Sequence, residues 1–220
     1  MTFDAALPVF AAILVWFVST GALLWLASAP RAAHAATMAI LSVVMAAATA
    51  GVVLIGPEAS VAGAFAGFVF GVTIWAWHEA AFLFGFLTGP RRSECPPGLS
   101  PWRRFIAASE TVIAHEVAIA LNAALLVVLS SSAANQTAMW TFLLLWGMRL
   151  SAKANIFVGA PHLSDELLPE RLRYLKSYFG PKRITVFFAA TMILITIITV
   201  ALAAAALAAP AGAHQGASLG

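Results

Sequence analysis

Long apolar runs constrain the fold of this chain more than any other feature of its sequence. A run of about 20 apolar residues is long enough to cross the hydrocarbon core of a bilayer as one α-helix. Six such runs occur, at residues 7–29, 36–55, 61–89, 104–130, 137–159 and 184–209. The eleven prolines lie at or beyond the ends of these runs, as expected because proline inside a membrane helix removes a hydrogen bond that lipid cannot replace. The sequence predicts an all-α integral membrane protein with a bundle of about six transmembrane helices.

The composition excludes a soluble globular domain. Charged residues make up only 10% of the chain and hydrophobic residues 62%, whereas a typical soluble domain has about 25% charged residues. The single cysteine, Cys95, rules out a disulfide framework within the chain. No basic run or zinc-ligand spacing indicates a nucleic-acid partner. We therefore expect one transmembrane domain over residues 1–220, surrounded by the lipid bilayer.

Basic residues outside the apolar runs lie in only three of the connecting loops. They are Arg31 after the first run, Arg91, Arg92, Arg103 and Arg104 after the third, and Arg171, Arg173, Lys176, Lys182 and Arg183 after the fifth. Cytoplasmic loops carry the excess of Lys and Arg in membrane proteins. The sequence thus predicts that these three loops are cytoplasmic and that both termini, including the tail 210–220, are periplasmic. Residues expected to meet lipid headgroups or partner proteins there are Arg91, Arg92, Arg103, Arg104, Arg171, Arg173 and Lys176.

Residues 164–179 in the last basic loop have a helical pattern of their own. The apolar residues recur at the spacing of one helical face, at Leu168, Leu172, Leu175 and Phe179. Basic residues flank this stripe. The pattern predicts a short amphipathic helix on the cytoplasmic surface of the membrane. The alternative is a connector that packs against the bundle.

Three of the runs contain ionisable residues. Placing such a side chain in the middle of a membrane helix costs about 2.5–3.5 kcal/mol on insertion scales, so their presence indicates a structural or functional role. These residues, which we call the polar layer, are His78, Glu79, Glu110, His115, Glu116, Arg149 and Lys153. At about 1.5 Å per residue from the cytoplasmic ends of their runs, His78, His115 and Arg149 all lie about 17 Å deep. That is near the middle of a hydrocarbon core about 30 Å thick. We take the polar layer as the candidate functional site.

Small residues indicate that the helices carrying this layer pack closely. Gly63, Gly67 and Gly71 form a doubled GxxxG pattern in the third run, and such a pattern lets another helix approach. His78 lies two helical turns beyond Gly71 and continues the glycine face. The third run is therefore expected to contact a neighbouring helix along this face.

One interpretation of the polar layer is a buried ion-pair network that holds the bundle together. In it Glu79 and Glu116 would pair with Arg149, and Glu110 would pair with Lys153. Because this set has one carboxylate in excess, one acid would have to be neutralised.

A second interpretation makes the polar layer a cofactor or transport site. A bis-histidine haem, or a histidine-ligated chlorin between the third and fourth runs, needs His78 and His115 to face each other. A di-iron site is disfavoured because Glu110 and His115 point about 140° apart on a helix and only two runs supply acids. No metal site is therefore assigned. A proton or substrate path would use the same residues, but no inverted repeat supports a transporter.

Several stretches resemble a known family. They are WFVSTGALLWL in the first run, WHEAAFLFGFLTGPRR in the third, AHE in the fourth, TFLLLWGMRLSAKANIFVGAPHL in the fifth and LPERLRYLKSYF after it. On these stretches the chain is similar to the PuhE family, the photosynthetic complex assembly protein 2 of purple and aerobic anoxygenic phototrophic bacteria. Ala154 and Ala160 depart conservatively from the pattern. The resemblance implies a multi-pass protein of the bacterial cytoplasmic (inner) membrane, linked to building the reaction centre and light-harvesting complexes and to bacteriochlorophyll supply.

Two functions follow as expectations. The first is a non-enzymatic assembly factor with reaction-centre or light-harvesting subunits, and pigment, as partners. The second is a membrane enzyme or redox protein acting on a tetrapyrrole or quinone. In that case His78 and His115 would be cofactor ligands, Glu79 and Glu116 acid–base groups, and Arg149 an anchor for a carboxylate. Neither the residues nor the resemblance identifies a reaction.

Overall fold

Every regular element in the computed structural model of the chain, which describes residues 3–163 and 165–208, is a helix. The long helices are α1 (Phe3–Ser28), α2 (Arg31–Leu54), α3 (Val61–Leu83), α5 (Ile113–Ser130), α6 (Thr137–Val158) and α7 (Val186–Ala208). The short ones are α4 (Pro101–Ser109) and two 3-10 helices, η1 (Asp165–Leu167) and η2 (Glu170–Tyr178). The predicted all-α class is confirmed. Residue 164 and the predicted tail 210–220 lie outside the described residues.

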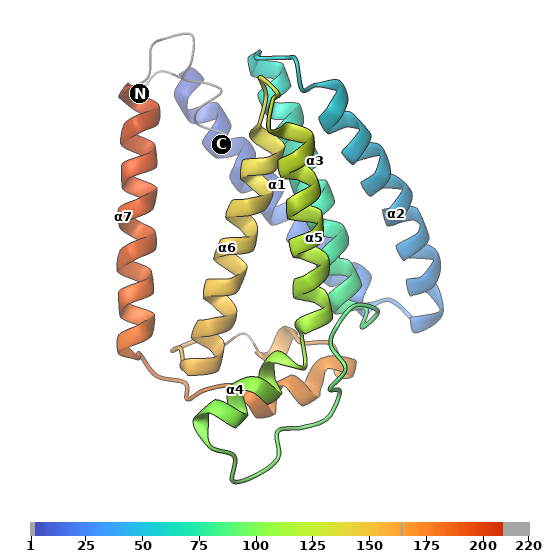
Figure 1. Cartoon of the computed structure of the whole chain (residues 1–220), viewed down its shortest axis with the longest axis vertical. Helices are drawn as coiled ribbons and strands as arrows, with labels where there is room; N and C mark the ends of the chain where they lie inside the picture. Colours follow the sequence, from blue (N-terminus) through green and yellow to red (C-terminus); the bar gives the residue numbers. More distant parts are fainter. Residues whose placement is uncertain (1–2, 164, 209–220) are drawn as a thin grey trace.

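Five helices in the described residues are long and apolar enough to cross a membrane. They are α1, α2, α3, α5 and α7. Helix α6 has 22 residues, but it carries Arg149 and Lys153, which make it less apolar than the others. It nevertheless runs alongside α3 and α5 in the bundle (Figure 1). The sixth span therefore stays a prediction.

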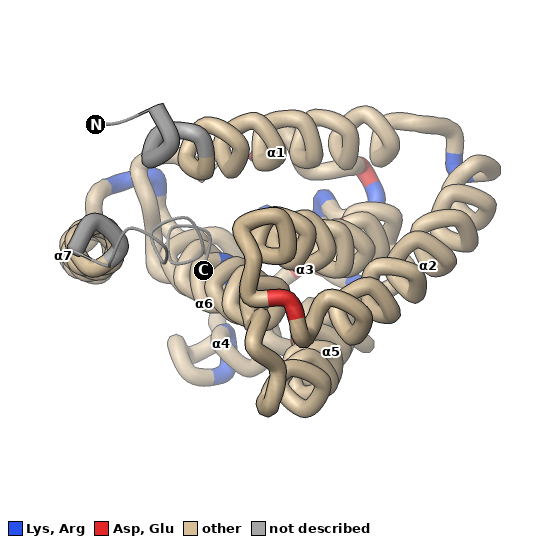
Figure 2. The backbone as a smooth tube through the Cα atoms, turned by 90° about the horizontal axis from the view of Figure 1, so that it is seen from above, with Lys and Arg blue, Asp and Glu red and all other residues tan. Residues whose placement is uncertain are grey.

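Helix α3 lies in the middle of the bundle, with α1, α2, α5 and α6 around it (Figure 2). It packs most extensively against α6 and α2. Helix α7 stands beside α6 at the edge (Figure 1). The start of α1 and the end of α7 lie at one end of the bundle, and the loops with most of the basic residues lie at the other (Figure 1). Which end faces the periplasm remains a prediction.

The glycine face of α3 contacts α6, as the GxxxG pattern indicated. A methyl group added at Gly71 would lie 2.8 Å from the carbonyl oxygen of Ala138 and 3.0 Å from Cβ of Thr141. One added at Gly67 would lie 3.0 Å from Cβ of Thr137. Only glycine allows this approach of the two backbones, and it brings the polar residues of α3 within reach of α6.

The apolar run predicted that the third helix would extend to residue 89. Helix α3 instead ends at Leu83. Gly85 adopts φ +74°, a left-handed conformation that favours glycine and commonly terminates helices. The amide nitrogens of Gly85 and Phe86 donate to the carbonyl oxygens of Phe82 and Ala81 at 2.9 Å each. This pair of bonds is a Schellman motif, which closes the helix while apolar sequence continues beyond it.

The fourth predicted span, 104–130, divides into α4 and α5 with a turn at residues 110–112. The loop after α3 interrupts the helix. The backbone nitrogen of His115 donates to the carbonyl oxygen of Thr88 at 2.9 Å. The backbone nitrogen of Arg91 donates to the carbonyl oxygen of Glu110 at 3.2 Å. A Cβ atom at Gly89 would lie 2.0 Å from that carbonyl oxygen, so the loop passes too close for any larger residue.

The predicted amphipathic surface helix over residues 164–179 is wrong, and the alternative, a connector packed on the bundle, is observed. The segment forms η1 and η2. Leu172 and Leu175 are buried with Phe82 of α3, and Leu168 and Phe179 pack at the edge of this cluster. Because α3 ends at Leu83, the side chain of Phe82 is not covered by a further turn of helix, and the apolar residues of this segment pack against it.

Candidate functional site

The two His-Glu dipeptides of the polar layer place histidine and glutamate on different helix faces. Neighbouring residues on an α-helix point about 100° apart. Glu79 of α3 and Glu116 of α5 therefore reach basic residues of α6, whereas the histidine beside each is buried between α3 and α5. The dipeptide is repeated because two helices face the same third helix.

Two ion pairs join α3 and α5 to α6. Arg149 Nη2 lies 2.9 Å from Glu79 Oε2. The Lys153 ammonium group bonds the Glu116 carboxylate, whose second oxygen accepts a hydrogen bond of 3.1 Å from the Trp146 indole nitrogen. These side chains are only 12–33% exposed. Four charges of the polar layer are thus compensated inside the bundle.

The pairing differs from the predicted network in two of its three pairs. Glu79 pairs with Arg149 as expected, but Glu116 pairs with Lys153. Glu110 pairs with Arg91 of the loop after α3, Nε to Oε2 at 2.7 Å, and not with Lys153. Glu110 lies in the turn before α5 and so cannot belong to the same span.

The two histidines of the polar layer lie near the ends of their helices. His78 lies five residues from the end of α3 and His115 two residues into α5, or about 8 Å and 3 Å at 1.5 Å per residue. Both helices stop short of their apolar runs, so the two histidines lie closer to the helix ends than a count along the runs indicated. The depth of about 17 Å in the membrane stays a prediction. The layer lies just above the loops and η2.

The two histidine rings lie edge to face in the α3–α5 interface, with their planes 70° apart. Their ring centroids are 6.4 Å apart, and both residues are fully buried. The Asn122 amide nitrogen lies 3.0 Å from His78 Nε2; with the amide as donor, His78 carries its proton on Nδ1. Neither nitrogen of His115 has a hydrogen-bond partner among the described residues. His115 is therefore the least satisfied polar side chain of the layer.

Aromatic rings enclose both histidines. Phe82 lies 4.8 Å from the His115 ring, and Phe142 lies 5.7 Å from the His78 ring, between centroids. The bis-histidine haem or chlorin stays a prediction. Among the described residues, no three His, Cys, Asp or Glu side chains are grouped to hold a metal ion.

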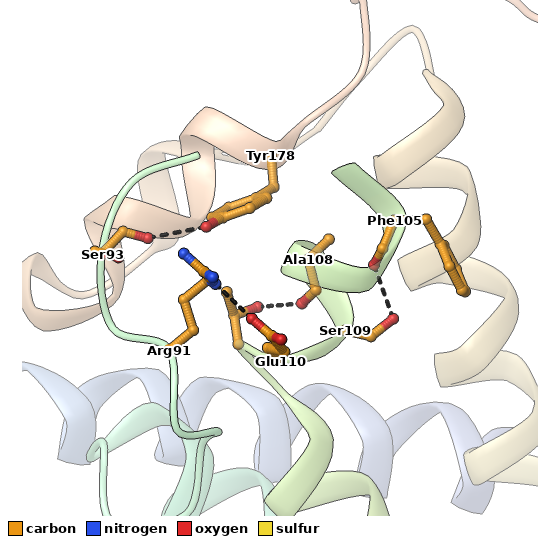
Figure 3. Close-up of polar contacts among 8 residues, drawn as sticks. Arg91, Ser93, Phe105, Ala108, Ser109, Glu110 and Tyr178 are labelled. Atoms are coloured by element: carbon orange, nitrogen blue, oxygen red, sulfur yellow. Dashed lines mark hydrogen bonds and ion pairs between the residues drawn. The ribbon is translucent and has the colours of Figure 1, made fainter. Parts of the chain in front are cut away.

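The basic loops fold over the same end of the bundle and use several predicted headgroup-binding residues internally. Figure 3 shows the Arg91–Glu110 pair beside Tyr178, whose hydroxyl donates to the Ser93 carbonyl at 3.1 Å. Arg104 donates to the carbonyls of Tyr178 and Phe179 at 2.6 and 3.1 Å.

Only some of the basic residues remain on the surface. Arg171 donates to the Phe84 carbonyl at 2.7 Å, at the end of α3. Together with Arg91 and Arg104 it is hydrogen-bonded within the protein. Contact of the seven basic residues with lipid or partners stays a prediction. The exposed ones are Arg92, Arg103 and Arg173, and Lys176 lies 3.7 Å from Asp165.

Comparison with known proteins identifies the family of the chain. Residues 2–220 match the family described as "Protein of unknown function (DUF3623)". The chain belongs to this family. It is also 34% identical over 191 residues, 85% of this chain and 70% of the relative, to the "Uncharacterized 30.4 kDa protein in puhA 5'region" of Rhodobacter capsulatus. No solved structure matches the chain. Neither description names an activity or PuhE, so the assembly role stays a prediction for this DUF3623 protein.

Sequence reasoning missed one residue of the basic end of this DUF3623 protein. His34 lies before the second apolar run in sequence but in the first turn of α2 in the structure, where it is buried and stacks on Phe84 at 4.3 Å between ring centroids. Its Nε2 bonds the Leu26 carbonyl at 3.2 Å and its Nδ1 accepts from Arg171 at 2.9 Å. The only signal was its position one turn after Arg31, since α2 begins five residues before its apolar run.

Proposed function

We propose that this DUF3623 protein is a membrane assembly factor that supports formation of the photosynthetic reaction-centre and light-harvesting complexes and their supply with bacteriochlorophyll. The observation that carries the proposal is the pairing of charges within the polar layer. Glu79 with Arg149 and Glu116 with Lys153 join three helices. The groups that an enzyme would need as acid, base and carboxylate anchor are engaged with one another, which favours a scaffold over a catalyst.

The outer helices supply the surface that such a scaffold needs. In the most apolar stretch of 18 residues in each of α1 and α7, no residue is buried inside the bundle. Phe17 and Trp25 on α1 are 75% and 74% exposed. Large apolar surfaces of this kind mark contact with lipid or with other membrane helices. In the proposed function α1 and α7 contact helices of the photosynthetic subunits while these assemble.

The relative from Rhodobacter capsulatus supports the same setting. Its printed name places it in the puhA 5' region. That location fits the photosynthetic role implied by the resemblance of this chain to the PuhE family. We infer that the two proteins serve the same process in the cytoplasmic membrane, with the basic loops of this chain on the cytoplasmic side.

Affinity purification from phototrophically grown membranes of the native host tests the proposal. The tagged chain, extracted in a mild detergent, is expected to recover reaction-centre or light-harvesting subunits well above an untagged control, as counted by mass spectrometry. Phe17→Ala combined with Trp25→Ala should lower this recovery several-fold, because aromatic side chains dominate interface energies. Val128→Ala on α5, also 72% exposed, is the matched control and should not. Recovery of no such subunit from membranes rich in them would refute the proposal.

A second candidate function is the binding of a tetrapyrrole by His115. It is favoured by one observation, the full burial of an imidazole with neither nitrogen bonded among the described residues. His115 alone could serve as an axial ligand, since Asn122 occupies Nε2 of His78. A bound pigment or haem would supply light absorption or electron transfer. The absorption spectrum discussed below separates this candidate from the first.

A further inference from the structure

A cavity of about 290 Å³ lies at the basic end of the bundle, apart from the ion pairs of the polar layer. It forms where the start of α2, the turn after α3 and η2 meet. Its lining residues are Arg31, His34, Phe84, Gly85, Phe86, Thr88, Arg92, Arg171, Leu172 and Tyr174. Three of these are arginines and none is an aspartate or glutamate. We call this space the arginine cavity.

The arginines of the cavity have no carboxylate partner among the residues that the structure describes. In the part of the chain that the structure describes, the ion pairs involve other basic residues, and Arg31, Arg92 and Arg171 form none. Burial and the nearby Arg31 guanidinium lower the pKa of Arg171. Like charges brought together in this way disfavour one another. The arrangement therefore attracts an anion.

Two hydroxyl groups of the lining also lack partners. The side-chain oxygens of Thr88 and Tyr174 are buried and form no hydrogen bond within the described residues, although nearly all buried polar groups in proteins do. Burial raises the pKa of Tyr174, against the opposing charge of Arg92. Tyr174 thus keeps its proton at neutral pH, and both hydroxyls are available as donors close to Arg92.

The start of α2 adds a further positive contribution at the cavity. Helix α2 begins at Arg31, has no side-chain cap and has no acidic residue in its first turn. The positive end of its dipole is therefore uncompensated by the protein, and helix N-termini favour anions. The arginines, the two hydroxyl groups and the helix end come from the start of α2, the loop after α3 and η2, and all of them border the arginine cavity.

We propose that the arginine cavity binds a phosphate group, carried either by an anionic phospholipid or by a free phosphate compound. Three guanidinium groups and two hydroxyls offer more donors than the two oxygens of a carboxylate can use. A phosphate has more acceptor oxygens and is the preferred partner of clustered arginines. The cavity lies among loops predicted to face the cytoplasm, at the level of lipid headgroups, where both sources of phosphate occur. This site is independent of the proposed assembly function.

The test compares the full-length protein with Arg31→Gln combined with Arg92→Gln. Both arginines are exposed, so the double variant is expected to fold, whereas Arg171 is left unchanged because it bonds the end of α3. Arg173→Gln on η2 is the matched control, since Arg173 lies outside the cavity and pairs with Glu170. One set of samples, reconstituted in nanodiscs of phosphatidylcholine with or without phosphatidylglycerol, is analysed for lipids retained after extraction. A second set, delipidated in neutral detergent, is titrated with inorganic phosphate and with pyrophosphate.

Wild type and Arg173→Gln are expected to bind one probe equally, and the double variant about tenfold or more weakly, as expected for the loss of charged hydrogen bonds. Tyr174→Phe should weaken binding by a smaller factor. Selective retention of phosphatidylglycerol identifies a lipid, and binding of phosphate or pyrophosphate without lipid identifies a soluble ligand. The proposal is overturned if no probe binds wild type better than phosphatidylcholine does. It is equally overturned if the double variant binds like wild type.

Discussion

Glu79→Ala is expected to destabilise the bundle by about 3 kcal/mol. Removing one partner of a buried ion pair costs about 3–5 kcal/mol because the other charge is left unpaired. We expect the lower end, since the Arg149 side chain keeps 33% of its surface exposed whereas Glu79 keeps 12%. Arg149→Ala should cost less, because a lone carboxylate can be neutralised by a proton and a guanidinium cannot. The double variant should cost less than the sum of the two single variants.

The fraction of protein that survives heating in neutral detergent, followed by gel filtration, measures these effects. A loss of 3 kcal/mol corresponds to a fall in Tm of about 6–12 °C for a chain of this size. Glu170→Ala is the control, because it breaks the exposed Glu170–Arg173 pair, whose side chains are 68% and 65% exposed, and exposed pairs contribute at most about 1 kcal/mol. If Glu79→Ala and Glu170→Ala shifted the Tm equally, the ion pair to α6 would not hold the bundle together.

Gly71→Leu is expected to have an effect of similar size through packing. A Cβ atom at Gly71 would already lie 2.8 Å from the backbone oxygen of Ala138, and backbone cannot rotate aside as a side chain can. Overpacking a core costs about 1–3 kcal/mol and occasionally more. Since α3 would have to move away from α6, the change should also weaken the ion pair between Glu79 and Arg149.

Gly147→Leu provides the matched control for this change. Gly147 lies on α6, and a Cβ atom there would meet nothing within 4 Å. The same substitution is expected to leave the Tm unchanged or to raise it slightly, since glycine is a poor helix former. The measurement is again the thermal survival in detergent. Equal losses for Gly71→Leu and Gly147→Leu would mean that the glycine face does not position α3 on α6.

The helices and their approach were predictable from the sequence because each depends on local pattern. The apolar runs predicted the five helices that could span a membrane, and the GxxxG pattern predicted the face of α3 that contacts α6. The early end of α3 was also locally encoded. Gly85 is the signal for that helix terminus, because its left-handed backbone conformation favours glycine.

The remaining errors concern contacts between distant segments, which one sequence does not reveal. Helix α4 separates from α5 because the loop near Gly89 bonds the turn at Glu110. Glu110 consequently pairs with Arg91, and Glu116 takes the lysine assigned to Glu110. His78 and His115 also lie closer to their helix ends than predicted, because the prediction was counted from the ends of the apolar runs.

We predict that the polar layer holds the helices together and binds no cofactor. The most direct test is an absorption spectrum, with metal analysis, of the detergent-purified protein from its native membrane. We predict no stoichiometric tetrapyrrole band and no stoichiometric iron or magnesium, with the same spectrum for His115→Ala. A stoichiometric Soret band or bound metal that disappears in His115→Ala would contradict the claim and make the layer a pigment or haem site.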